Sequence, residues 1–249
     1  MSDLQHLISH AETLLHRLEG LLPQVLADPD WSVHAFRWRR QHGRGYLQAV
    51  ARPHRIELSD LRDVEEQKKL LVRNTRQFLQ GLPANNVLLT GARGTGKSSL
   101  VKALLTTFAA DGLRLVEVDK SDLVDLPDIS ELLRNRPERF VIFCDDLSFD
   151  ADEPGYKVLK VALDGSIASA ADNMLIYATS NRRHLMPEFM AENLETQYVG
   201  DEIRPGETSE EKVSLSERFG LWLSFYTFDQ EAYLDIVRHW LRSFGLTSL

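Results

Sequence analysis

The chain has 249 residues, of which 43% are hydrophobic and 27% are charged, and its formal net charge is −8. This composition is typical of a globular domain and excludes a disordered chain, while the single cysteine, Cys144, excludes an internal disulfide and a multi-cysteine metal site. No apolar run reaches the roughly 18 residues that span a bilayer, and no export signal is visible. We therefore expect a cytoplasmic protein with no membrane partner.

The N-terminal segment has the spacing of one amphipathic helix that ends near Gly20 and Pro23. Its apolar residues form a single stripe: Leu4, Leu7, Ile8, Ala11, Leu14, Leu15, Leu18, Leu21 and Leu22. Because an isolated helix is marginal in water, this stripe needs a surface to cover it. That surface is either the chain's own core or a partner in an oligomer.

The segment 32–56 carries no acidic residue, although the chain as a whole is acidic. It is rich in basic and aromatic side chains: Arg37, Arg39, Arg40, Arg44, Arg52, Arg55, His34, His42, His54, Trp38 and Tyr46. Arginines interleaved with aromatic residues suit phosphate contacts and base stacking, which would indicate nucleic-acid binding. The alternative is a solvated linker, or a patch that faces acidic residues of the protein itself.

From residue 56 onward, strands and helices are expected to alternate, which predicts a parallel sheet covered by helices on both faces. The expected strands are 86–90, 113–118, 140–144 and 174–178, after a short lead-in at 56–61. The expected helices are 64–79, 98–110, 128–135 and 156–167. Cys144 falls in the apolar run of a strand, where a small core residue is expected.

The loop after the first of these strands fits the phosphate-binding pattern G-x-x-x-x-G-K-[ST] without a mismatch. Its residues are Gly91, Ala92, Arg93, Gly94, Thr95, Gly96, Lys97 and Ser98. Glycines let the backbone approach a phosphate closely, and the start of the following helix presents N–H groups to it. Lys97 is expected to reach the β- and γ-phosphates of a nucleotide, and the Ser98 hydroxyl to bind Mg²⁺.

Two later strands end in polar residues that the same sheet edge would bring to this loop. The strand 140–144 is followed by Asp145, a candidate Mg²⁺ ligand, and Asp146, a candidate for orienting or deprotonating the attacking water. Asn181 follows the next strand and could bond both the water and the γ-phosphate. The alternatives are exposed acids in a turn and a turn-forming asparagine.

Together these motifs resemble the AAA+ ATPases over residues 56–240. Three strings are similar to the bacterial AAA+ family named domain of unknown function 815: Gly-Ala-Arg-Gly-Thr-Gly-Lys-Ser-Ser-Leu-Val-Lys, Phe-Cys-Asp-Asp-Leu-Ser-Phe and Ala-Thr-Ser-Asn-Arg-Arg-His-Leu. The resemblance implies that ATP contacts the loop as far as Ser99. It also implies a five-stranded parallel sheet, with an added strand beside the loop strand, and a helical lid.

The same resemblance implies a homo-oligomer, a ring or a filament, in which an arginine reaches the γ-phosphate bound by the neighbouring subunit. Ser216-Glu217-Arg218-Phe219-Gly220 looks like the motif that carries this arginine, so Arg218 is the candidate. The alternative is an ion pair between Arg218 and the acidic stretch 192–211 of its own chain.

The segment 56–61 looks like the family's lead-in strand near adenine, followed by Arg62 and Asp63 where glycine is usual. Residues 230–240 look like the first lid helix, and the sequence offers no position for the further lid helices or their second sensing arginine. We therefore expect an N-terminal helical and basic extension (1–55), an AAA+ core (56–228) and a truncated lid (229–249).

The function expected from these residues is Mg²⁺-dependent ATP hydrolysis that remodels or loads a protein or nucleic-acid partner. Lys97, Asp146, Asn181 and Arg218 would be its catalytic residues. One alternative is an ATP-dependent binding or assembly switch with negligible turnover. Another is a small-molecule kinase that uses the same loop.

Overall fold

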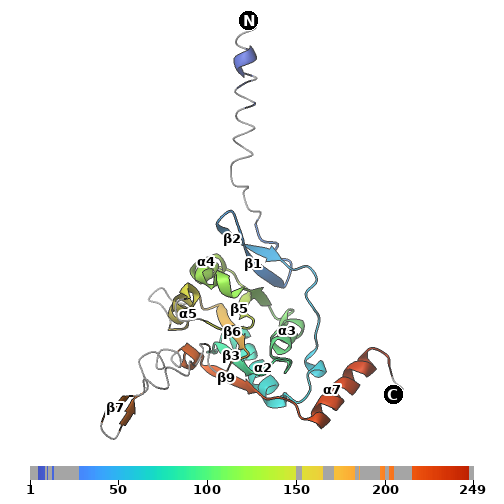
Figure 1. The fold of residues 1–249 in the computed structure, drawn as a ribbon. Helices are drawn as coiled ribbons and strands as arrows, with labels where there is room; N and C mark the ends of the chain where they lie inside the picture. The colour runs from blue at the N-terminus through green and yellow to red at the C-terminus, as the bar shows by residue number, and fades with distance from the viewer. Residues whose placement is uncertain are drawn as a thin grey trace.

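A seven-stranded sheet lies at the centre of the molecule, with helices on both of its faces (Figure 1). The computed structural model describes residues 5–8, 10, 13, 28–149, 153–164, 171–182, 185, 197–199, 202–204 and 215–246. The strands of this sheet are β1 (Ala35–Gln41), β2 (Arg44–Ala49), β3 (Val87–Gly91), β4 (Leu113–Glu117), β5 (Arg139–Cys144), β6 (Met174–Ser180) and β9 (Leu221–Phe225). Strands β7 (Gln197–Val199) and β8 (Glu202–Arg204) form a separate antiparallel pair.

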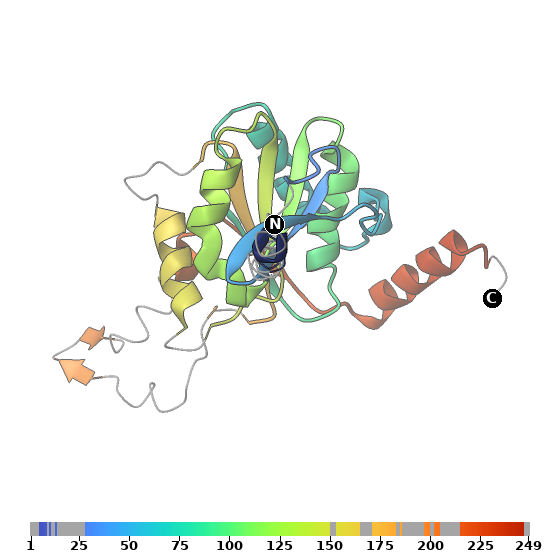
Figure 2. The same cartoon turned by 90° about the horizontal axis from the view of Figure 1, so that it is seen from above.

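The helices are α2 (Glu65–Leu79), α3 (Lys97–Phe108), α4 (Leu126–Leu133), α5 (Pro154–Asp164) and α7 (Gln230–Ser243), with 3-10 turns η1 (Leu58–Asp60) and η2 (Lys120–Asp125). Helices α4 and α5 cover one face of the sheet, and α2 and α3 cover the other (Figure 1). Helix α7 projects on the side of α2 and α3, away from the sheet (Figures 1 and 2). The predicted alternation of strands and helices is confirmed.

The strands run in the order β2-β1-β4-β5-β6-β3-β9. All neighbouring pairs are parallel except β1 and β2. Strand β6 lies between β3 and β5, so the added strand expected beside the loop strand is present. Because β3, β5 and β6 are parallel, the residues that follow them emerge at the same edge of the sheet.

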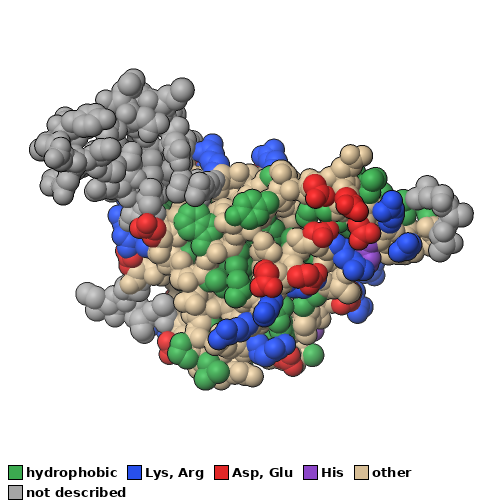
Figure 3. All heavy atoms as spheres, turned by 90° about the horizontal axis from the view of Figure 1, so that it is seen from below, with side chains coloured by type: hydrophobic (Ala, Val, Ile, Leu, Met, Phe, Trp, Pro, Cys, Tyr) green, Lys and Arg blue, Asp and Glu red, His purple; other side chains and the backbone are tan. Residues whose placement is uncertain are grey.

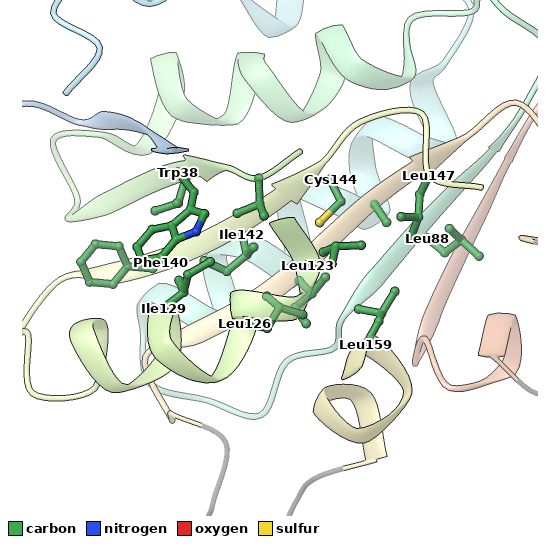
Figure 4. Close-up of a cluster of buried hydrophobic side chains, with 14 of the residues drawn as sticks. Trp38, Leu88, Leu123, Leu126, Ile129, Phe140, Ile142, Cys144, Leu147 and Leu159 are labelled. Atoms are coloured by element: carbon green, nitrogen blue, oxygen red, sulfur yellow. The ribbon is translucent and has the colours of Figure 1, made fainter. Parts of the chain in front are cut away.

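The apolar run in β5 follows from burial on both faces. Successive side chains of a strand point to opposite faces, and Ile142 and Cys144 belong to the core under α4 and α5 (Figure 4), whereas Val141 and Phe143 belong to the core under α2 and α3. The Cys144 thiol is free and buried, which raises its pKa to about 12. Its expected place as a small core residue is confirmed.

Helix α2 buries polar side chains as well as apolar ones on its inner face. Asn74 and Thr75 both lie within 3.0 Å of the Tyr177 hydroxyl, at 3.0 and 2.9 Å. Burial raises the pKa of Tyr177 to about 12. The buried hydroxyl is therefore neutral and hydrogen-bonded, so this polar cluster in the core leaves no uncompensated group.

The prediction of five strands is wrong, because the basic segment contributes the hairpin β1–β2 to the sheet edge. Strand β1 pairs in parallel with β4. Its apolar side chains alternate with arginines: Phe36 and Trp38 are buried, 1% and 2% exposed, while Arg37 and Arg39 point the other way. Alternation of this kind predicts a strand, but the many basic residues of the segment favoured an interpretation as a binding surface or a linker.

The arginines of β1 meet acidic residues of the same chain. Arg37 binds Glu117 at 2.6 Å and Arg39 binds Asp119 at 3.0 Å. Arg40 binds Asp125 through two nitrogens, at 2.7 and 2.6 Å. The structure therefore supports the alternative of a basic patch that faces acidic residues of the protein itself. Acidic and basic side chains also lie close together on the face of the molecule shown in Figure 3.

Asp125 should be the acid that holds β1 in place, because its buried carboxylate also accepts the indole N–H of Trp38 at 2.9 Å. In Asp125→Ala this buried N–H loses its acceptor, which costs about 1–3 kcal/mol. Asp119→Ala removes only an exposed ion pair, worth about 0–1 kcal/mol. Urea unfolding should show a lower midpoint for Asp125→Ala than for Asp119→Ala, and equal midpoints would contradict this assignment.

The predicted N-terminal helix falls mostly outside the described residues. Residues 5–8, 10 and 13 are helical and exposed, with Leu7 70% and Ile8 49% exposed, so these two members of the stripe are not covered by the chain's own core. Among the described residues, no helix combines the length and the hydrophobicity required to cross a bilayer.

Candidate nucleotide-binding site

The loop between β3 and α3 has a backbone that requires glycine. Gly91 has a φ of 137°, and a Cβ there would lie 1.9 Å from the carbonyl oxygen of Phe225 on β9. Gly96 has a φ of 90° and immediately precedes α3. The positive φ favours glycine at both positions, and at Gly91 the close approach of the Phe225 backbone excludes any other side chain. The loop therefore leads directly into the N-terminus of α3, where free N–H groups favour an anion.

Lys97 lies over the inside of this loop. Its ammonium donates hydrogen bonds to the carbonyl oxygens of Gly91 and Ala92, at 2.8 and 2.6 Å, and to Oδ1 of Asn181 at 3.1 Å. Burial lowers the pKa of Lys97, and the nearby carboxylates of Asp146 and Asp145 oppose that shift. The structure thus brings the end of β6 to the phosphate loop.

The end of β5 reaches the same loop from the other side. Ser98 Oγ donates a hydrogen bond to Oδ1 of Asp145 at 2.5 Å, and Thr179 Oγ1 donates to the same oxygen at 2.6 Å. The two predicted Mg²⁺ ligands therefore lie side by side, and both are hard oxygen donors of the kind that Mg²⁺ takes. Ser98 and Asp145 fit the cation that the motif implies.

Asp146 occupies the turn directly after Asp145, with a φ of 52°. Its Oδ1 accepts a hydrogen bond from Asn181 Nδ2 at 2.5 Å, and its Oδ2 lies 3.5 Å from an Arg93 nitrogen. Four predicted residues, Lys97, Ser98, Asp145 and Asp146, thus join Asn181 in one hydrogen-bonded group. Their chemical roles remain predictions.

These residues line one side of a cleft of about 410 Å³. The other side is formed by the segment before α2 and by α7: Asp60, Leu61, Arg62, Val64, Phe228, Ile236 and Trp240. His239 on α7 connects the two elements, with its ring nitrogens 3.3 Å from Arg62 and 3.5 Å from Asp60. The cleft has room beyond the phosphate loop for the remainder of a nucleotide.

The prediction of a lead-in strand at 56–61 is wrong, because this segment contains the 3-10 turn η1 instead. The turn is closed locally by Asp60, whose carboxylate accepts the backbone N–H of Glu57 at 2.9 Å. Asp63, at the position where glycine is usual, has a φ of 57°. Asp63 therefore adopts a left-handed conformation without being glycine, and aspartate tolerates this better than most residues.

Arg218 lies apart from this cleft and is not among the described residues that line it. It forms an ion pair with Asp164 at the end of α5. An intramolecular ion pair is the expected alternative, and within the described part of the chain its acid is Asp164. The stretch 192–211, which the expectation named, lies largely outside the described residues.

The structure adds site residues that the motifs did not identify. Thr179 bonds Asp145, and Trp240 and Ile236 line the cleft from α7. Thr179 could have been found, because it lies near the end of β6, two residues before Asn181, where side chains two apart point to the same side of an extended chain. The aromatic and aliphatic lining could not, because those side chains look like any other apolar positions of a helix.

The glycine loop between β3 and α3, the two acids after β5 and the insertion of β6 beside β3 define a P-loop ATPase fold of the AAA+ type. The chain belongs to the family described as "Protein of unknown function (DUF815)", whose model matches residues 31–248. The match includes the hairpin β1–β2 and excludes the predicted N-terminal helix. A search of curated proteins found no match.

Several solved structures are similar to this chain. The Holliday junction branch migration motor RuvB of Thermotoga maritima is 19% identical, over 76% of this chain and 54% of that one, with a TM-score of 0.47. AMPPCP-bound DnaA of Aquifex aeolicus is 16% identical, over 75% and 54%, with a TM-score of 0.48. The Orc1 protein of Aeropyrum pernix in complex with DNA is 17% identical, over 74% and 49%, with a TM-score of 0.49. This chain spans about half the length of each.

Proposed function

We propose that the protein binds ATP with Mg²⁺ in this cleft and hydrolyses it to remodel or load a protein or nucleic-acid partner. One observation carries the proposal: hydrogen bonds join Ser98 to Asp145, 47 residues away, and Lys97 to Asn181, 84 residues away. The residues that we propose to bind the cation, to hold phosphate and to sense the nucleotide thereby lie at a single loop. No single motif could supply this combination.

The hydrolysis we propose depends on positioning and charge rather than on covalent chemistry. When the nucleotide binds, the Lys97 ammonium gives up its hydrogen bonds to the carbonyl oxygens of its own loop and donates to phosphate oxygens instead. Ser98 and Asp145 would hold Mg²⁺, which would neutralise phosphate charge. Asp146 accepts a hydrogen bond from the attacking water and orients it. The amide of Asn181, already between Lys97 and Asp146, contacts both the water and the γ-phosphate.

The proposal includes a homo-oligomer, a ring or filament, in which Arg218 of one subunit approaches the nucleotide of the next. Support comes from its position: Arg218 lies apart from the cleft of its own chain, bound to Asp164. A guanidinium that remains charged and matches phosphate oxygens suits this task. Binding a neighbour's phosphate then requires that Arg218 exchange the Asp164 carboxylate for the phosphate.

Phosphate release per chain, measured over a range of protein concentrations, tests this shared site. Turnover should rise steeply with concentration, and Arg218→Ala should lower it about 100-fold at saturating ATP. Arg73→Ala, which changes an exposed arginine of α2, serves as the control. Mixing Arg218→Ala with Lys97→Ala should restore part of the activity, because each variant supplies what the other lacks.

One result would contradict the shared arginine, and another would favour the binding switch over hydrolysis. Turnover that is independent of concentration and unchanged in Arg218→Ala would contradict the shared arginine. Phosphate release that is absent at every concentration, together with ATP-dependent assembly in sedimentation experiments, would indicate the alternative of a binding switch.

A further inference from the structure

Thr179 is a buried polar residue next to the candidate site, 1% exposed. It is the second-to-last residue of β6, two residues before Asn181. Its hydroxyl makes two hydrogen bonds. It donates to Oδ1 of Asp145 at 2.6 Å and accepts from the backbone N–H of Asp146 at 2.9 Å. The direction of both bonds is fixed, because a backbone N–H can only donate, so the single hydroxyl proton is directed to the Asp145 carboxylate.

A third hydrogen bond joins the same two segments: the backbone N–H of Leu147 donates to the carbonyl oxygen of Thr179 at 2.6 Å. Three successive residues after β5 are therefore tied to one residue of β6. Asp145 is held by its carboxylate, and Asp146 and Leu147 are held by their backbone. The turn is therefore held in two ways: by its hydrogen bonds to Thr179, and by the side chain of Leu147, which is buried in the core.

The anchoring matters because Asp146 has a left-handed backbone, with a φ of 52°. Aspartate tolerates this conformation better than most residues, but it is still less favourable than the right-handed one and depends on surroundings that hold it. It presents the Asp146 carboxylate to Asn181 Nδ2 and to Arg93. A looser turn would move both carboxylates, because Asp145 and Asp146 are adjacent in it.

We propose that Thr179 is a positioning residue for both acids, which fixes the Asp145 carboxylate for the cation and the Asp146 backbone for the water-orienting role. This inference rests on the proposed function. Thr179 itself is assigned no contact with cation or nucleotide, because its single proton is directed to Asp145 and the residue is buried. Groups that orient a ligand of a metal in this way typically change its affinity 10- to 100-fold when removed.

Three substitutions test the inference. Thr179→Val keeps the shape and removes the hydroxyl, Thr179→Ser keeps the hydroxyl and removes the methyl group, and Thr179→Ala removes both. For each, binding of a fluorescent ATP analogue is measured in EDTA and then titrated with Mg²⁺, and phosphate release is measured at saturating Mg²⁺ and ATP. Should Thr179→Val fail to fold, as judged by thermal unfolding, the Ser and Ala variants still separate the hydroxyl from the methyl group.

Thr179→Val and Thr179→Ala should need about tenfold more Mg²⁺ for half-maximal binding, with affinity in EDTA within about threefold of wild type. Their kcat should fall more than their KM for ATP rises. Thr179→Ser should match the wild type. Wild-type Mg²⁺ dependence in Thr179→Val, or an equal loss in Thr179→Ser, would overturn the inference while leaving the proposed function intact. A wild-type protein that binds no nucleotide would overturn both.

Discussion

Lys97→Ala is expected to weaken ATP binding about 100-fold, because the variant loses at least two charge-assisted hydrogen bonds to phosphate, each worth about 1.5 kcal/mol or more. Turnover at saturating ATP should fall about 1,000-fold, since the same ammonium faces the oxygens on which charge accumulates during transfer. Calorimetric titration with ATP and a phosphate-release assay measure the two effects. Lys97 is the only lysine among the described residues that line the cleft, so no other lysine of this lining can replace it.

Lys102→Ala is the matched control for this experiment. Lys102 lies on the same helix, α3, but its ammonium rests 5.9 Å from the ring centre of Phe143, away from the cleft lining. Its removal should leave ATP affinity unchanged. Equal affinity for ATP in Lys97→Ala and Lys102→Ala would contradict the proposal that the phosphate loop binds ATP through Lys97.

Asp146→Asn is expected to lower turnover about 1,000-fold while ATP affinity changes little, because a neutral amide accepts a hydrogen bond from the attacking water more weakly than a carboxylate and so orients it less well. Asparagine retains the oxygen that accepts the Asn181 amide, so the local geometry should persist. The measurement is single-turnover phosphate release at saturating ATP, alongside an ATP-binding isotherm.

Asp111→Asn provides the control for the loss of one carboxylate, because Asp111 is exposed and lies in the loop after α3, at the far end of that helix. This variant should hydrolyse ATP at the wild-type rate. If Asp146→Asn retained wild-type turnover, Asp146 would have no part in the reaction. If it lost ATP affinity to the same extent as turnover, Asp146 would act in binding rather than in hydrolysis.

The central part of the fold could be predicted because its physical signals are local. Residues 140–144 of β5 are all apolar, as burial on two faces requires, and the loop glycines precede a helix at fixed spacing. Helix α2 likewise ends where Gly81 allows a φ of 72°. The sheet edge was missed for the opposite reason. The arginines of β1 have acidic partners about 80 residues away, so their pattern looked like a basic surface until the fold supplied those partners.

In the candidate site, too, the residues with short-range signals could be predicted, and those that depend on distant partners could not. The motif spacing was enough to name Lys97, Ser98 and Asp145, because phosphate and Mg²⁺ binding constrain residue types at short range. The hydrogen bond from Thr179 to Asp145 joins residues 34 apart on different strands, and the Asp164 partner of Arg218 lies on α5. Such contacts depend on the order of strands and on the direction of a helix, which short motifs do not specify.

The most direct measurement is a calorimetric titration of the wild-type protein with ATP, carried out once in Mg²⁺ and once in EDTA. The account predicts one nucleotide per chain and binding at least about tenfold tighter with Mg²⁺, because the cation would join the nucleotide to Ser98 and Asp145. Binding that is equally weak in both conditions, or absent at millimolar ATP, would contradict it.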